Sequence, residues 1–210
     1  MSNLKEELSN EIKEIWKIVL LAKDFYNCAF YFQNGSSSDD EKFLRDSRPF
    51  QFFAHGFWRL TIIELTKLFS MSESHRFNVP KFVGKLGKDG HFAALNISSE
   101  LICRWQQSLE DFQPKIESIV VLRNKLYAHT DRMKPDTSQM DLSFQDVKHL
   151  LDLGRQIVQD IYQSILGAEA SMDSPFLEKT DLNFISILAW EKNDQIQAVL
   201  GEKLKWKKGN

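Results

Sequence analysis

Residues 2–32 read SNLKEELSNEIKEIWKIVLLAKDFYNCAFYF, and this stretch decides the class of fold. Its apolar side chains recur every three or four residues, at Leu4, Leu8, Ile12, Ile15, Val19 and Ala22. Such spacing places them on one face of a helix. Gly35 follows the last apolar residues and is a common helix terminator. The sequence therefore begins with a long amphipathic helix that ends near Asn34.

Similar periodicity continues along the chain. We expect helices over about 50–69, 80–86, 98–130 with a break or bend at Pro114, 143–167 and 180–191, separated by loops at 33–40, 70–78, 87–90 and 131–140. No alternating pattern is long enough to predict a sheet. We therefore predict an all-α protein, an antiparallel up-and-down bundle of four to five helices with short extra helices. Residues 1–170 would form the bundle, and residues 171–210 a helical extension packed on it or trailing from it.

Composition agrees with helices and narrows the function. The chain has 210 residues, with 16 Phe and 5 Trp against only 9 Gly and 5 Pro. Its 27 basic and 29 acidic side chains give a net charge of −2, which excludes a polybasic protein that binds nucleic acid through bulk charge. The N-terminus is charged, and no apolar run approaches the ~20 residues of a membrane span. We therefore expect a cytoplasmic protein that is not associated with a membrane.

Motifs for phosphate loops, dinucleotides, zinc proteases and serine hydrolases are missing from the sequence. The five histidines are too scattered for a zinc spacing. Two isolated cysteines, Cys28 and Cys103, are typical of reduced thiols. We therefore predict neither a metal nor a cofactor.

One segment carries chemistry: residues 116–131 read IESIVVLRNKLYAHTD. Arg123 falls where the helical pattern calls for an apolar side chain, so it needs an acidic or phosphate partner or faces another surface. His129 follows six residues later, about 120° away around a helix. The two side chains can converge if the helix end unwinds, or if a second copy of the chain brings its own pair.

A cleft with arginine and histidine suits metal-free RNA cleavage, in which the 2′-hydroxyl attacks the adjacent phosphate. His129 would accept or supply a proton, and Arg123 would stabilise charge on the phosphoryl oxygens. The alternative is a pair of cations at a helix end, bonded to carbonyl oxygens.

The nine residues RNKLYAHTD at 123–131 resemble the Arg-to-His motif of the HEPN superfamily of all-helical RNases, most closely its abortive-infection (AbiU-type) branch. The resemblance implies a four-helix bundle, a homodimer and a composite RNase site with Arg123 and His129 as catalytic residues and Asn124 as their polar companion. Some members of the superfamily do not cleave RNA. In others a nucleotidyltransferase antitoxin modifies a tyrosine two residues after the motif histidine, a position held here by Asp131.

Several further residues are candidates for supporting roles. Glu64 interrupts an apolar stripe, and we expect it to pair with Arg123 or to reach solvent at the edge of its helix. Tyr127 shares the helical face of Arg123 and would stack on a base or pack in the core. A basic cluster beside the motif would hold RNA phosphates or simply be solvated: Lys125, Arg132 and Lys134.

Three functions remain open from the sequence. The first is an RNA-cleaving homodimer in phage defence or in a toxin–antitoxin pair. The second is a non-cleaving module of the same fold that holds RNA or a nucleotide. The third is a structural helical adaptor.

Overall fold

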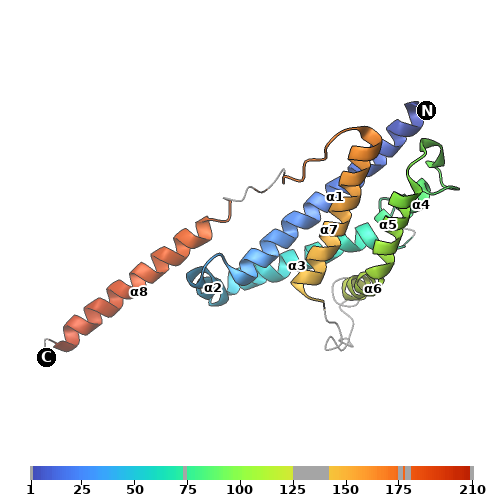
Figure 1. Cartoon of the computed structure of the whole chain (residues 1–210). Helices are drawn as coiled ribbons and strands as arrows, with labels where there is room; N and C mark the ends of the chain where they lie inside the picture. The colour runs from blue at the N-terminus through green and yellow to red at the C-terminus, as the bar shows by residue number, and fades with distance from the viewer. Residues whose placement is uncertain (1, 73–74, 125–141, 175–176, 178–180, 209–210) are drawn as a thin grey trace. The chain divides into compact units, whose positions relative to one another are not determined.

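The computed structural model of the chain describes residues 2–72, 75–124, 142–174, 177 and 181–208 (Figure 1). Within these residues there are helices and connecting turns but no β-strand, which confirms the predicted all-α bundle. The elements are α1 (Ser2–Asn34), α2 (Ser38–Arg45), α3 (Arg48–Phe69), α4 (Val79–Leu86), η1 (Ala93–Leu95), α5 (Ser99–Asp111), α6 (Gln113–Leu122), α7 (Phe144–Ile161), η4 (Tyr162–Leu166) and α8 (Phe184–Lys208).

The chain divides into two compact units, and α1 and α3 each contribute to both. Unit 1 contains residues 1–26 and 58–174, and unit 2 contains residues 27–57 and 175–210. The structure thus groups residues 27–57 with the C-terminal segment. The predicted division into residues 1–170 and 171–210 stays a prediction, because a compact unit is not the same as a domain that folds separately.

Helix α1 forms as its apolar spacing predicts. Leu8, Ile12, Ile15 and Ala22 are fully buried in the core of unit 1. The helix ends at Gly35, whose φ of +66° lies in the left-handed region that favours glycine. A Cβ there would lie only 2.7 Å from the backbone nitrogen of Glu41, so the turn requires glycine twice over.

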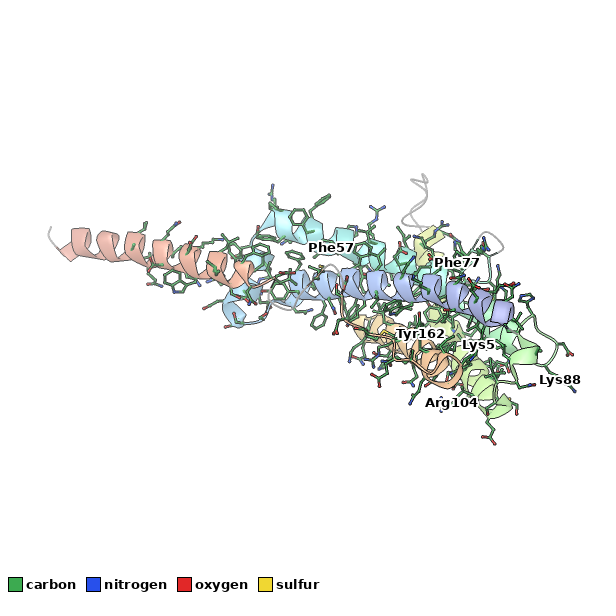
Figure 2. The ribbon with its side chains drawn as sticks, turned by 90° about the horizontal axis from the view of Figure 1, so that it is seen from above. Lys5, Phe57, Phe77, Lys88, Arg104 and Tyr162 are labelled. Atoms are coloured by element: carbon green, nitrogen blue, oxygen red, sulfur yellow. The ribbon has the colours of Figure 1, made fainter. Side chains whose placement is uncertain are left out.

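Helices α3 and α7 complete the centre of unit 1 with α1. The Cβ position of Gly154 on α7 would lie 3.4 Å from Val19 on α1 and 3.5 Å from Phe69 on α3, so α7 packs against both helices. Helix α5 is tied to α7 by Asp160, which accepts hydrogen bonds from the indole of Trp105 at 3.0 Å and from Arg104, labelled in Figure 2, at 2.7 Å.

The predicted break of the long helix at Pro114 is confirmed. Helix α5 ends at Asp111, Phe112 is shared as a cap, and Pro114 lies in the first turn of α6. Proline is tolerated there because the first amide groups of a helix have no partner within it. The result is a short helix, α6, that ends immediately before Arg123.

Unit 2 has its own small core, rich in aromatic rings. Phe32 stacks on Phe57, which is labelled in Figure 2, with ring centroids 5.8 Å apart. Helix α8 joins α2 through a hydrogen bond of 2.8 Å from Ser186 to the buried carboxylate of Asp40. Within unit 2, polar and aromatic contacts therefore hold together residues that are distant from one another in sequence.

Two boundaries differ from the predictions. Residues 33–40 were expected to form a loop, but α2 begins at Ser38, with Ser37 as its cap and three acidic residues in its first turn. The last helix was expected to end at Glu191, yet α8 continues to Lys208. Both helices have few core-facing side chains; in α8 only Ile185 and Ala189 are buried among the residues whose side chains are described. An apolar repeat is therefore a weak signal for either.

No helix within the described part of the chain combines the length and the apolar character needed to cross a membrane.

The start of α7 is fixed by a capping box. The amide of Asp146 donates to the hydroxyl oxygen of Ser143 at 3.1 Å, and the amide of Ser143 donates to the Asp146 carboxylate at 2.9 Å. The Ser143 hydroxyl also donates to that carboxylate at 2.6 Å, and this bond is the main cause that lowers the pKa of Asp146. The ionised carboxylate therefore stabilises the fold above about pH 4, and its contribution is lost as the pH falls through the lowered pKa.

We expect Ser143→Ala to lower the free energy of unfolding by about 1 kcal/mol at pH 7. The difference from the wild type should narrow in acid, because protonated Asp146 no longer gains from the hydroxyl. Urea unfolding at pH 7 and pH 3 measures both values. The control is Ser108→Ala. Ser108 lies within α5 and its hydroxyl bonds back to the Arg104 carbonyl, so this variant should keep the free energy of unfolding of the wild type. An equal loss at both pH values for Ser143→Ala would contradict the assignment.

Candidate functional site

Arg123 lies at the C-terminal end of α6, where the helix changes character. Ile116, Ile119 and Leu122 bury one face of α6 in the core. At Arg123 and Asn124 the backbone adopts π-helical turns. Such turns occur often at functional sites because they redirect side chains out of a regular helix. Arg123 is thereby half-buried, and Asn124 is exposed.

The guanidinium of Arg123 has a single polar partner among the described residues. Its Nη1 donates to the side-chain oxygen of Asn124 at 2.8 Å. No carboxylate in the described part of the chain lies within ion-pair distance of it. An arginine has five N–H donors, so most of the fork is left for other acceptors.

Glu64, the predicted partner of Arg123, is engaged elsewhere. Its buried carboxylate accepts from Lys67 at 2.6 Å, and Lys67 lies three residues further along α3. A partner one turn away on the same helix is reached without any tertiary adjustment. The direct pair of Glu64 with Arg123 is therefore not formed among the described residues.

Arg123 lines a pocket of about 850 Å³ in unit 1. The pocket lies between the end of α3 with the loop that follows it, the end of α5, and α6. Its walls are mostly apolar: Phe69, Leu109, Ile116, Val120 and Val121. Glu110, Gln113 and Glu117 add polar groups from α5 and α6. This volume is in the range of sites for small organic ligands, which combine apolar walls with a few polar groups.

The same pocket contains a histidine that sequence reasoning missed. His75 follows α3 in the loop, and its Nδ1 lies 2.7 Å from the hydroxyl of Ser70. The buried Asn78 caps α4 and donates to the His75 carbonyl at 2.9 Å, so both the ring and the backbone of His75 are held. The only local sign of this arrangement is the cap signal of Asn78 ahead of Pro80.

The pKa of His75 lies below its ordinary value. Burial is the main cause, and the positive charges of Arg123, Lys81 and Lys67 add to it. Burial and the nearby positive charges both lower the pKa because each disfavours the imidazolium form. His75 is therefore a neutral imidazole at pH 7, and it experiences the charge of Arg123.

A family model described as AbiU2, a HEPN family, matches residues 5–182. The matched region covers most of the chain, including α3, α6 and Arg123. The chain belongs to the AbiU2 family of HEPN domains. It is thus an abortive-infection-related domain, as the motif predicts. Neither the curated proteins nor the solved structures include one that matches this chain.

Much of the motif of this HEPN domain lies outside the described residues, because the structure does not describe residues 125–141. The predicted catalytic His129 is among them. So are the predicted supporting and RNA-binding residues Lys125, Tyr127, Asp131, Arg132 and Lys134. Of the predicted site, the structure thus describes Arg123, Asn124 and Glu64.

Within the described segments, no three His, Cys, Asp or Glu side chains come close enough together to hold a metal ion. The polar groups of the HEPN pocket are instead one arginine, one histidine, amides, hydroxyls and two carboxylates.

We expect Arg123→Gln to raise the pKa of His75 towards its ordinary value, because the substitution removes one of the positive charges that disfavour the imidazolium. An NMR titration of the imidazole carbon-bound protons measures this pKa. Arg45→Gln, at an exposed arginine of α2 in unit 2, is the control and should leave it unchanged. An unchanged pKa in Arg123→Gln would contradict the shared pocket.

Proposed function

We propose that this HEPN domain is a metal-independent endoribonuclease that acts in phage defence or as the toxin of a toxin–antitoxin pair. It cleaves RNA by attack of the 2′-hydroxyl at a composite site of a homodimer, with Arg123 and His129 as catalytic residues. DNA lacks the attacking hydroxyl and is spared.

The observation that carries the proposal is the state of Arg123. It is half-buried at a pocket, and its only polar partner among the described residues is the neutral side chain of Asn124. A guanidinium in this state favours an anion, and its planar fork matches two oxygens of a phosphate. Bound there, a phosphate would be stabilised as charge builds on its oxygens during attack.

The pocket walls supply the second support. RNA sequences are recognised chiefly through unstacked bases, which are held against apolar or aromatic surfaces. Apolar side chains such as Val120 and Phe69 line most of the pocket, beside Arg123. A base lying in the pocket would leave its phosphate near the guanidinium. Two carboxylates, Glu110 and Glu117, disfavour a second phosphate in the pocket itself.

The spacing of the motif supports a dimer. Six residues separate Arg123 from His129, about 120° around a regular helix, so one straight helix does not direct both at one phosphate. A second copy of the chain would bring its own pair into the same cleft. A nucleotidyltransferase-type antitoxin is a further proposed partner, although Asp131 offers no hydroxyl for the modification known in the superfamily.

The pocket also favours a second candidate function. Its volume of about 850 Å³ and its apolar walls suit a nucleoside held without cleavage. In that case the chain is a non-cleaving RNA- or nucleotide-binding dimerisation module.

We expect the purified full chain to cleave total RNA in EDTA, and to lose at least about 100-fold in rate on either Arg123→Ala or His129→Ala. Gel electrophoresis of the products measures the rate, and a 2′,3′-cyclic phosphate end identifies attack by the 2′-hydroxyl. His91→Asn, at an exposed histidine that pairs with Glu7, is the matched control and should cleave normally.

Two outcomes would contradict the endoribonuclease. Cleavage that persists in both variants would mean that a contaminant or another site is responsible. Absence of cleavage, with RNA binding that Arg123→Ala abolishes, would establish the binding module in its place. A monomer that cleaves RNA would overturn the composite site alone.

A further inference from the structure

His75 has no role in the proposed function, yet it is a titratable group that lines the same pocket as Arg123. It comes from the loop between α3 and α4, whereas Arg123 comes from the end of α6. Both line one pocket, and the positive charge of Arg123 helps to lower the pKa of His75. A histidine and an arginine that line one pocket from separate elements can act on the same bound group.

The loop holds the imidazole in a defined orientation. Ser70, itself buried, lies 2.7 Å from Nδ1, while Asn78 fixes the backbone carbonyl. Lys81 donates to the same carbonyl at 3.2 Å and to the carbonyl of Ser72 at 2.7 Å. When Nδ1–H donates to Ser70, the lone pair of Nε2 is left as the proton acceptor of the ring.

The charged groups around His75 favour its neutral form. Lys67 of α3, Lys81 of α4 and Arg123 after α6 disfavour the imidazolium, and burial acts in the same direction. Glu110 and Glu117 line the pocket from α5 and α6, but neither contributes to the shift. A histidine that stays neutral at pH 7 is ready to accept a proton.

Cleavage of RNA by its 2′-hydroxyl needs two proton transfers. The 2′-oxygen forms a bond to phosphorus and gives up a proton, and the bond from phosphorus to the 5′-oxygen breaks as that oxygen gains one. The products are a 2′,3′-cyclic phosphate and a free 5′-hydroxyl. One histidine accounts for only one of the two transfers at a time. In the proposed composite site the other transfer falls either to the His129 of the second copy or to a further side chain of the pocket that Arg123 lines.

We infer that His75 is the general base of this reaction: its Nε2 accepts the proton of the 2′-hydroxyl of an RNA whose phosphate is bound at Arg123. This inference rests on the proposed endoribonuclease activity. It leaves His129 to supply the proton to the departing 5′-oxygen. Ser70 is a positioning residue that holds the ring.

The test compares two RNAs in the full chain, one ordinary and one with sulfur in place of the 5′-bridging oxygen at the cleaved phosphate. Sulfur leaves without a proton, so it removes the need for the acid but not for the base. We expect His75→Gln to cleave ordinary RNA about 100-fold more slowly or worse. The sulfur substrate should not restore its rate, whereas it should restore that of His129→Ala.

Binding and folding controls accompany the rates. His75→Gln should bind a 2′-O-methyl RNA, which cannot react, with unchanged affinity, and should show the circular dichroism of the wild type. Lys67→Gln provides a variant that keeps His75. Removal of that positive charge raises the pKa of His75, so the rise of kcat/KM with pH should move to higher pH.

The outcomes separate the two proposals. If the wild type cleaves no RNA, the proposed function fails and the inference fails with it. If the wild type cleaves and His75→Gln cleaves equally well, only the inference is overturned. Rescue of His75→Gln by the sulfur substrate would make His75 the acid and would also overturn it. An unmoved pH profile in Lys67→Gln would count against His75 in the same way.

Discussion

The candidate site depends on the packing of the end of α3 against α6. Thr66 and Phe69 of α3 and Ile119 of α6 are almost completely buried, and the Thr66 hydroxyl lies 3.5 Å from the Ile119 carbonyl oxygen. The loop with His75 leaves from one of these helices, and Arg123 ends the other. Buried side chains are packed as densely as organic crystals, so the packing of α3 against α6 fixes where the loop with His75 and the side chain of Arg123 begin.

In the proposed function, this arrangement lets a nearly neutral chain bind an anion. The net charge of −2 provides no general attraction for nucleic acid. Arg123 instead offers a directed set of donors in a partly desolvated position, where an ionic hydrogen bond is stronger than in water. The neighbouring cations Lys67 and Lys81 are occupied by Glu64 and by backbone carbonyls, respectively. They act on His75 through charge, whereas Arg123 keeps most of its donors unengaged among the described residues.

Local signals made most of the fold predictable from the sequence. Gly35 ends α1, Pro114 marks the break before α6 and Ser143 starts α7, as expected. Each signal acts over a few residues, so no tertiary information is needed to use it. The short helix α2 escaped because its capping signal at Ser37 is not followed by a clear apolar repeat.

The candidate site was only partly predictable, since it depends on contacts between distant residues. The irregular position of Arg123 in an apolar stripe pointed to it directly. The pairing of Glu64 with Arg123 failed because Lys67 lies one turn away on the same helix and engages the carboxylate first. His75 carries no periodic signal, and only the packing of α3, α4 and α6 places it in the pocket that Arg123 lines.

The composite site can be tested most directly by mixing two inactive variants, Arg123→Ala and His129→Ala, and measuring RNA cleavage by the resulting heterodimer. A mixed dimer retains one arginine and one histidine in the shared cleft. The account predicts that the mixture cleaves RNA clearly faster than either variant alone. A mixture as inactive as its components, with the heterodimer verified by native mass spectrometry, would contradict it.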